Sequence, residues 1–211
     1  MIETSSELYR RLCALPHQPG DMIYENEAIA LAIAAHDRVC VEIGSWRGMS
    51  TAMLASTATY VIAVDVHNGI RDTTSPETRE PPTLEGMRLT LAAAGVSHKV
   101  AIVPSVSSDA APLVERLTDY KVGCLFIDGS HREEDVYMDL VLYTAFLRSP
   151  YYLVLDDLGY ATVARAFQRW KNESNRRLSP VDLRTWGIED PIHNRLHEGA
   201  VSKCTFFRVM R

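Results

Sequence analysis

Acidic side chains close two apolar runs in the second half of the chain. Asp128 ends the run 122–128, and Asp156 and Asp157 stand at the end of the run 151–156. Neighbouring strands of a sheet lie about 4.8 Å apart, so we expect the three carboxylates to converge at one edge. Like charges so close repel one another unless they are protonated or bound to a cation. Oxygen ligands select a hard ion, so the pattern predicts a site for Mg²⁺, with Mn²⁺ or Ca²⁺ as alternatives, at these three aspartates.

The same stretch also has a purely local interpretation. Ser130-His-Arg-Glu133 matches the S-x-x-E capping box of a helix, and paired aspartates before a glycine-containing turn are common in loops. Capping accounts for Ser130 and Glu133 but leaves Asp128 and Asp156 unexplained. His131 follows Asp128 by three residues, on the expected first turn of a helix, and imidazole is a usable general base near neutral pH. We predict a catalytic His131, and the alternative is a solvated surface histidine.

Residues 41–50, Val-Glu-Ile-Gly-Ser-Trp-Arg-Gly-Met-Ser, place two glycines where a strand turns into a helix. Glycines there permit positive φ and let the backbone approach a ligand. The spacing Gly44-x-x-x-Gly48 differs from the G-x-G-x-x-G pyrophosphate fingerprint, and Glu42 before the turn repels phosphate but attracts an ammonium group. Asp65, at the end of the next apolar run, can accept both ribose hydroxyls. This set favours a nucleoside with a cationic tail, such as S-adenosylmethionine; the alternative is a structural turn with Asp65 capping a loop.

Buried strands must position these residues. Five apolar runs, rich in Val, Ile and Leu without strict alternation, are typical of strands buried on both faces of a parallel sheet: 39–43, 61–65, 100–104, 122–128 and 151–156. Helical patterns cover 25–35, 49–59, 84–94, 110–117, 131–147 and a segment with Val163, Phe167 and Trp170. Residues 205–210 have the pattern of a final strand. The repeated β–α alternation predicts a doubly wound, mostly parallel α/β sheet.

Three segments lie outside this alternation. Residues 1–36 are expected to hold two N-terminal helices, the first with a stripe of leucines on one face. Residues 68–83 form a long, proline-containing polar loop after the second strand, at the edge where open α/β sheets bind ligands. We predict a lid there, and a tolerated surface insertion is the alternative. Residues 178–200 show no firm pattern.

Composition narrows the classes of function. The 211 residues carry 22 Lys and Arg against 27 Asp and Glu, a formal net charge of −5, and fit a single domain, 1–211. The acidic balance argues against a nucleic-acid surface, and no apolar run reaches the roughly 18–20 residues of a membrane span. The cysteines are scattered and form no CxxC pair, and two of them, Cys40 and Cys124, lie inside apolar runs. The N-terminus does not resemble a signal peptide. Together these features predict a cytoplasmic protein. The sequence leaves open whether it forms a homo-oligomer.

The glycine segment, Asp65, Asp128 and the pair Asp156-Asp157 together resemble the class I S-adenosylmethionine-dependent methyltransferases. Within that class, the three aspartates are similar to those of the metal-dependent, catechol-type O-methyltransferases. They are also similar to a bacterial branch of sugar and antibiotic O-methyltransferases and cephalosporin-hydroxylase-like proteins. The resemblance covers residues 39–160. It implies a Rossmann-like sheet of seven strands with an antiparallel C-terminal strand.

The resemblance also implies a set of cofactor-binding residues along the chain. These are Glu42, Gly44, Trp46, Ser50, Asp65, Val66, Ser107 and Asp128. The residues of the glycine segment would lie at the methionine end of S-adenosylmethionine. Asp65 would hold the ribose hydroxyls, while Val66 and Ser107 would lie near the adenine.

The residues and the resemblance together predict methyl transfer from S-adenosylmethionine to a hydroxyl of a small molecule, assisted by a divalent cation. His131 occupies the place where catechol-type enzymes carry a lysine base, and a histidine base suits the sugar-modifying branch at least as well. Two other classes stay open. One is a nucleoside- or S-adenosylmethionine-binding protein without catalysis. The other is a nicotinamide-dependent oxidoreductase, which would share Asp65 but needs a phosphate-cradling glycine turn.

Overall fold

The computed structural model describes residues 3–18, 23–69, 82–119, 121–174, 176–188 and 204–209. Most of the predicted lid, residues 70–81, and positions 189–200 of the ambiguous segment lie outside the described residues. Across those described ranges, no helix is both long and apolar enough to cross a membrane.

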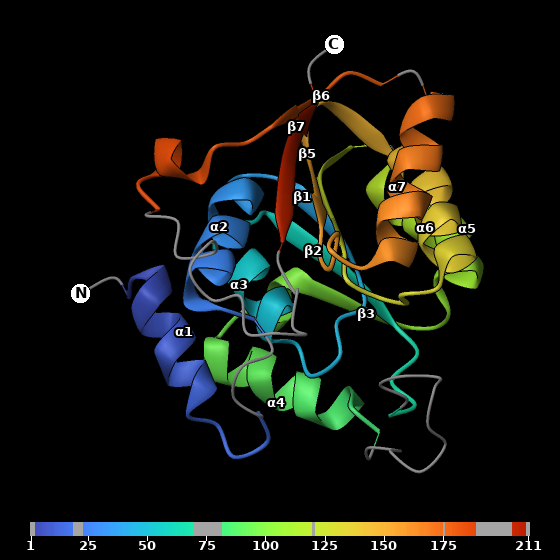
Figure 1. Cartoon of the computed structure of the whole chain (residues 1–211). Helices are drawn as coiled ribbons and strands as arrows, with labels where there is room; N and C mark the ends of the chain where they lie inside the picture. The colour runs from blue at the N-terminus through green and yellow to red at the C-terminus, as the bar shows by residue number, and fades with distance from the viewer. Residues whose placement is uncertain are drawn as a thin grey trace.

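A seven-stranded sheet in the order β3-β2-β1-β4-β5-β7-β6 forms the centre of the molecule (Figure 1). Its strands are β1 (Val39–Ile43), β2 (Tyr60–Asp65), β3 (Val100–Pro104), β4 (Val122–Ile127), β5 (Leu147–Leu155), β6 (Leu178–Pro180) and β7 (Thr205–Val209). Strands β1 to β5 are parallel, whereas β7 runs antiparallel to both of its neighbours, β5 and β6. The predicted doubly wound sheet with an antiparallel C-terminal strand is confirmed.

Helices cover both faces of the sheet (Figure 1). One face carries α1 (Ser5–Cys13), α2 (Glu25–Ala35), α3 (Met49–Thr57) and α4 (Leu84–Ala94), and the other carries α5 (Ser107–Thr118), α6 (Glu133–Thr144) and α7 (Ala161–Ser174). The short 3-10 helices η1 (Ser97–Lys99) and η2 (Leu183–Trp186) lie in connections. Neighbouring side chains of a strand enter opposite cores: Phe126 packs with α1 to α4, and Leu125 with α5 to α7. Burial on both faces explains why the strands show no polar alternation.

The helix predicted over 131–147 has different ends in the structure. Helix α6 runs from Glu133 to Thr144, and Leu147 is the first residue of β5, where it pairs with Val122 of β4. Pairing with a distant strand outweighs the helical spacing of Leu147. At the other end, α6 begins at Glu133, so His131 precedes the helix and its predicted place on the first helical turn is wrong. The other predicted strands and helices agree with the structure to within four residues at each end.

The carboxyl ends of β1, β2, β4 and β5 meet at one edge of the sheet. Ile127 pairs with Ile43 on one side and with Leu155 on the other, so the residues that follow these strands are neighbours. Strand β7 runs the opposite way, and its first residue, Thr205, pairs with Leu155. The start of β7 is thereby brought to the same edge.

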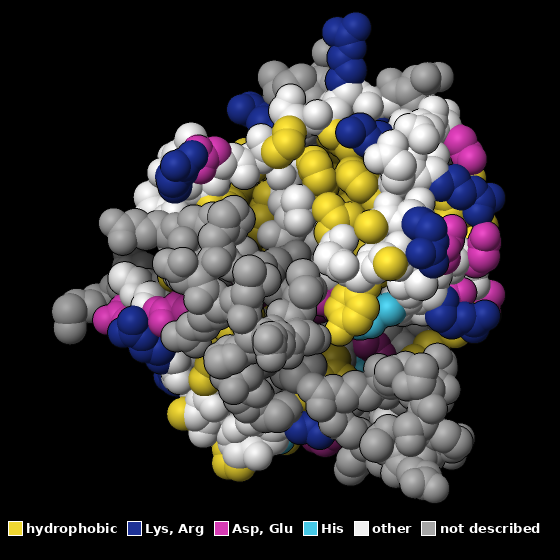
Figure 2. Space-filling model, viewed as in Figure 1, with side chains coloured by type: hydrophobic (Ala, Val, Ile, Leu, Met, Phe, Trp, Pro, Cys, Tyr) yellow, Lys and Arg dark blue, Asp and Glu magenta, His cyan; other side chains and the backbone are white. Residues whose placement is uncertain are grey.

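Charged side chains of both signs are interspersed over α6 and α7, at the right of Figure 2. Arg165 pairs with Glu133 at 2.6 Å, and Arg169 pairs with Glu134 at 2.9 Å. Exposed ion pairs contribute about 0–1 kcal/mol each, so buried apolar contacts account for most of the stability of this helix pair. The charges give the two helices a solvated outer surface.

Candidate active site

The three predicted metal ligands converge in the structure. Asp128 follows β4, and Asp156 and Asp157 follow β5. The backbone N–H of Asp156 donates to the carbonyl of Ile127 at 3.0 Å, which continues the strand pairing past the strand ends. The three carboxylates offer oxygens that all lie within 4.8 Å of one another. The expected convergence is confirmed, and occupation of the site by a cation stays a prediction.

Burial and repulsion disfavour three ionised carboxylates at this point. Desolvation raises the pKa of Asp128 well above its usual value, and the charges of Asp156 and Asp157 raise it further. Burial is also the main cause that raises the pKa of Asp156. Asp157 is 7% exposed, and within the described part of the chain its Oδ1 has no hydrogen-bond partner. A divalent cation fits here, because it would remove the repulsion and supply the missing partner of that oxygen.

His131 lies beside these carboxylates, in the loop between β4 and α6. Its Nε2 is 2.7 Å from Oδ2 of Asp157, and its ring stacks on Tyr160 with centroids 4.9 Å apart. The His131 side chain is 47% exposed and that of Asp157 only 10%, so the imidazole can be reached from solvent above a buried carboxylate. The catalytic role of His131 stays a prediction. Tyr160 carries no sequence signal, because its proximity to His131 depends on how α6 and α7 pack.

The capping-box interpretation of Ser130 and Glu133 is wrong. The residue that caps α6 is Arg132, and its side chain makes no capping hydrogen bond. The Ser130 hydroxyl accepts the N–H of Arg132 at 3.1 Å and donates to Asp135 at 2.7 Å. Glu133 pairs instead with Arg165 of α7. Ser130 therefore orders the loop that carries His131.

The glycine turn packs directly against the end of β4. Gly44 has a φ of +87°, and a Cβ there would overlap the carbonyl of Asp128 and lie 2.7 Å from Cα of Gly129. Only glycine allows this approach. The N–H of Asp128 donates to the carbonyl of Ile43 at 2.8 Å, next to the turn. The predicted cofactor turn and the predicted metal site therefore form one continuous structure.

Asp65 holds the same turn from the side of β2. One carboxylate oxygen accepts the N–H of Trp46 and the other accepts the N–H of His67, both at 2.7 Å. Trp46 is half-buried at a φ of +41°, and the guanidinium of Arg47 lies 4.7 Å from the centre of its ring. Val66 is 40% exposed at this edge. Each oxygen of Asp65 has a second lone pair, so a ribose could bind without disturbing the turn.

Three predicted cofactor residues have side chains that bond within the protein. Glu42 has no exposed surface; its Oε2 accepts the hydroxyl of Thr51 in α3, while its Oε1 is buried without a hydrogen-bond partner among the described residues. Burial raises the pKa of Glu42 to about 7, although the hydroxyl of Ser50, one residue before Thr51, lowers the pKa of the same carboxyl. Ser107 is the first residue of α5, and its hydroxyl bonds to buried Asp139 of α6. Glu42, Ser50 and Ser107 support the elements around the turn, and their contact with a cofactor stays a prediction.

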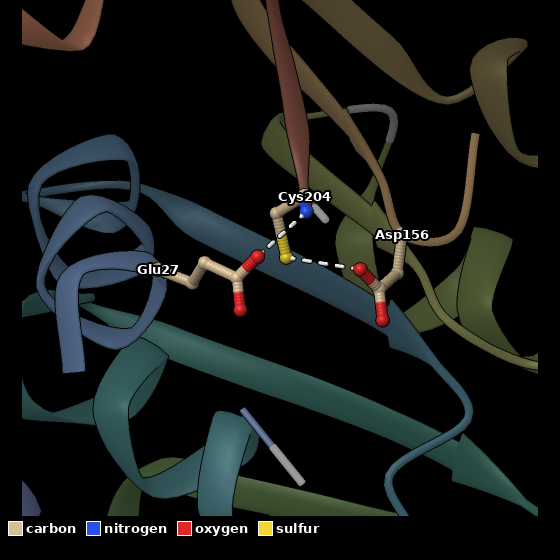
Figure 3. Close-up of side chains that lie close together, drawn as sticks. All are labelled: Glu27, Asp156 and Cys204. Atoms are coloured by element: carbon tan, nitrogen blue, oxygen red, sulfur yellow. Dashed lines mark hydrogen bonds between the residues drawn. The ribbon is translucent and has the colours of Figure 1, made fainter. Parts of the chain in front are cut away.

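A second buried group shares Asp156 (Figure 3). Cys204, the residue before β7, donates its thiol to Oδ1 of Asp156 at 3.5 Å and its backbone N–H to Oε1 of Glu27 at 3.0 Å. Glu27 is 2% exposed and Cys204 is 5% exposed. Neither residue carries a sequence signal, because an isolated cysteine and a glutamate in a helix become neighbours only when β7 pairs with β5.

A pocket opens beside the three aspartates. Asp128, His131 and Asp156 contribute polar groups to its lining, while Val136 of α6 and Val163 of α7 contribute apolar surface. Its free volume of about 10 Å³ is room for roughly one water molecule, so these described residues do not by themselves enclose a cavity for an organic ligand.

Comparison with protein families matches residues 41–158 to a methyltransferase domain. The matched segment contains the glycine turn, Asp65, the three aspartates and His131. The chain belongs to this methyltransferase domain family, and its fold confirms the resemblance to the class I S-adenosylmethionine-dependent methyltransferases. A search of curated protein sequences found no match.

Solved structures share the fold at low sequence identity. The O-methyltransferase TomG from Streptomyces achromogenes, in complex with S-adenosylmethionine, has a TM-score of 0.64 and 14% identity, covering 100% of this chain and 91% of that one. The O-methyltransferase from Bacillus cereus, in complex with S-adenosylhomocysteine (SAH), has a TM-score of 0.65 and 12% identity over 98% and 90%. An rRNA methylase from Streptococcus thermophilus has a TM-score of 0.61 and 12% identity over 90% and 100%. Since O-methyltransferases and an rRNA methylase share this fold, the fold does not identify the methyl acceptor of this chain, which must be inferred from the residues of its site.

Proposed function

We propose that this protein transfers a methyl group from S-adenosylmethionine to a hydroxyl of a small molecule, with the help of a divalent cation. The observation that carries the proposal is the gathering of Asp128, Asp156 and Asp157 beside the glycine turn, where Oδ1 of Asp157 is buried without a hydrogen-bond partner among the described residues. Proteins of the same fold in complex with S-adenosylmethionine or SAH support the choice of methyl donor.

The turn between β1 and α3 would bind the donor. Asp65 would accept the ribose hydroxyls while it keeps the N–H groups of Trp46 and His67. Gly44 and Trp46 would line the methionine end, and exposed Val66 would lie against the adenine. One carboxylate would thus shape the turn and bind the nucleoside.

The three aspartates would hold the cation, for which carboxylate ligands favour Mg²⁺ or another hard ion. When bound, such an ion lowers the pKa of a coordinated hydroxyl and orients it toward the methyl group. The protein supplies position: the bond from the Asp156 N–H to the Ile127 carbonyl holds Asp156 beside Asp128. Oδ1 of Asp157 is buried without a hydrogen-bond partner among the described residues, and the cation would supply one.

His131 would take the proton of the acceptor hydroxyl. Donation from its Nε2 to Asp157 favours the tautomer with the lone pair on Nδ1, so Nδ1 is the atom that receives the proton. The acceptor oxygen forms a bond to the methyl carbon as the carbon–sulfur bond breaks, and the electron pair of that bond stays on sulfur. Stacking on Tyr160 holds the plane of the imidazole during this step.

Two measurements on the purified protein test the proposal. Calorimetric titration with SAH and with NAD identifies the cofactor class. Transfer of labelled methyl from S-adenosylmethionine is then measured on catechols, sugars and other hydroxylated molecules, with ribosomal RNA as a comparison acceptor, in Mg²⁺ and in EDTA. We expect SAH to bind, transfer to a small molecule in Mg²⁺ and none in EDTA.

Other outcomes contradict the proposal in different ways. Binding of NAD without binding of SAH favours an oxidoreductase. Methyl transfer that persists in EDTA shows that the reaction does not need a divalent cation. The variant Asp157→Ala separates binding from catalysis, because it should keep its SAH affinity and lose transfer. A wild-type protein that binds SAH and methylates none of these acceptors favours a binding protein without catalysis.

A further inference from the structure

A chain of hydrogen bonds links the N-terminal helix α2 to the proposed cation site (Figure 3). Glu27 of α2 accepts the backbone N–H of Cys204 at 3.0 Å, and the Cys204 thiol donates to Oδ1 of Asp156 at 3.5 Å. All three side chains lie close together in Figure 3, where Cys204 stands between the two carboxylates. The hydrogen bonds run from α2, through the start of β7, to the end of β5.

We propose that Cys204 is a positioning residue that fixes the orientation of the Asp156 carboxylate for cation binding. The inference rests on the cation site proposed above. With Oδ1 of Asp156 held by the thiol, the carboxylate cannot rotate without losing a buried hydrogen bond, which is costly where no water replaces it. Partners that hydrogen-bond to a metal's carboxylate ligands orient those ligands and tune the affinity of the site.

Glu27 determines where the thiol stands. One of its oxygens accepts the N–H of Cys204 and the other accepts the N–H of Tyr24, at the start of α2, at 3.0 Å. The pairing of Thr205 with Leu155 aligns the next residue of β7 with the end of β5. These contacts hold the backbone of Cys204, and the hydrogen bond to Oδ1 of Asp156 holds its thiol.

Both Glu27 and Cys204 lie outside the segment 41–158 that matches the methyltransferase domain family. The ligand Asp156 lies inside it, so the N-terminal helix and the C-terminal strand of this chain complete a site within the matched domain.

Direct coordination by Cys204 is the competing interpretation, because ligand atoms of Glu27, Asp156 and Cys204 also lie within 4.8 Å of one another. The hydrogen bonds favour the positioning role. Both oxygens of Glu27 already accept backbone N–H groups, and the thiol already donates to Asp156. A second ion would have to break these contacts, whereas orientation of Asp156 uses them as they stand.

Mn²⁺ binding to the full-length protein, followed by electron paramagnetic resonance, tests the inference. Cys204→Ala removes the donor and Cys204→Ser retains one, while Cys40→Ala is the control because Cys40 is also a buried cysteine, in β1. We expect Cys204→Ala to weaken Mn²⁺ binding about tenfold, the low end for partners of metal ligands, because a thiol is a weak donor. Cys204→Ser should recover most of the affinity. SAH affinity should stay unchanged in all three variants.

Equal Mn²⁺ affinity in Cys204→Ala and Cys40→Ala would overturn the inference. If Cys204→Ala does not fold, infrared spectroscopy of the Cys204 thiol replaces it. The S–H stretching band of Cys204 is the band that is absent from Cys204→Ser. That band should shift to higher wavenumber in Asp156→Ala, and an unshifted band overturns the inference. A sulfur-to-metal absorption band with Co²⁺ that Cys204→Ser abolishes would make Cys204 a ligand and also overturn it. A separate comparison tests the cation site itself. If wild type and Asp157→Ala bind Mn²⁺ equally, the three aspartates do not form that site.

Discussion

His131 and Asp157 meet through Nε2 and Oδ2 at 2.7 Å. The second oxygen of Asp157 is buried without a partner among the described residues, in the group it forms with Asp128 and Asp156. One carboxylate therefore connects the proposed base to the proposed cation site. Asp157 has a φ of +55°, a left-handed conformation that is uncommon for a residue other than glycine. Backbone in such regions is concentrated at functional sites, in agreement with this double role.

Replacing His131 by alanine should slow methyl transfer without weakening the binding of the donor. Loss of a general base lowers kcat by about 10²–10⁴-fold. Calorimetry with SAH should give the wild-type affinity, because His131 contacts Asp157 and Tyr160, which are not among the predicted donor-binding residues. The control is His36→Ala, whose side chain is 65% exposed beside Asp37. An unchanged kcat in His131→Ala would show that His131 is not the general base.

Replacing Asp65 by alanine should weaken SAH binding. Hydrogen bonds to charged groups are worth about 1.5–3 kcal/mol, so a loss of about 10- to 100-fold in affinity is expected. An analogue of SAH without ribose hydroxyls separates the two roles of Asp65. The variant should bind SAH and the analogue alike, whereas wild type should prefer SAH. If Asp65→Ala still prefers SAH over the analogue, Asp65 does not bind the ribose hydroxyls.

Gly44→Ala should destabilise the protein far more than Gly95→Ala. Both glycines have positive φ, +87° and +73°, but a Cβ on Gly95 meets nothing within 4 Å, whereas one on Gly44 would overlap backbone at Asp128. Left-handed backbone alone costs roughly 1–2 kcal/mol, so the excess measured for Gly44→Ala reports the clash. Urea unfolding of both variants gives the two free energies. Equal losses would mean that the contact between the turn and β4 can relax.

Glu42 should make the protein less stable as the pH rises. Its folded-state pKa of about 7 exceeds the ordinary value of 4.5, because burial disfavours the charged form. The folded protein therefore keeps a proton that the unfolded chain releases between these values. The stability from this group is fully present below about pH 4.5 and is lost as the pH rises through 7.

The expected loss from Glu42 is roughly 2 kcal/mol between about pH 5 and pH 8. Urea unfolding at both pH values measures it, and Glu42→Gln should remove this part of the dependence. Asp128, Asp139 and Asp156 also have raised pKa values and act in the same direction in both proteins. The difference between wild type and variant reports Glu42 together with the part of the raised Asp128 pKa that the Glu42 charge causes. Identical slopes would show that Glu42 is not the responsible group.

The sheet and the convergence of the three aspartates could be predicted from the sequence, because both depend on local patterns. Apolar runs without alternation mark strands buried on both faces, and parallel strands end at a common edge. Asp128 and Asp156 each follow such a run, so their meeting needs no knowledge of side-chain packing. The turn at Gly44 could be located for the same reason.

Contacts made across the fold were decided only by the tertiary structure. Leu147 lies in β5, where it pairs with Val122, and His131 lies in the loop before α6, where it reaches Asp157. Cys204 lies beside Glu27 and Asp156 because β7 pairs antiparallel with β5. Sequence spacing describes neighbours within one element, whereas strand register and helix packing bring together residues that are far apart in the chain.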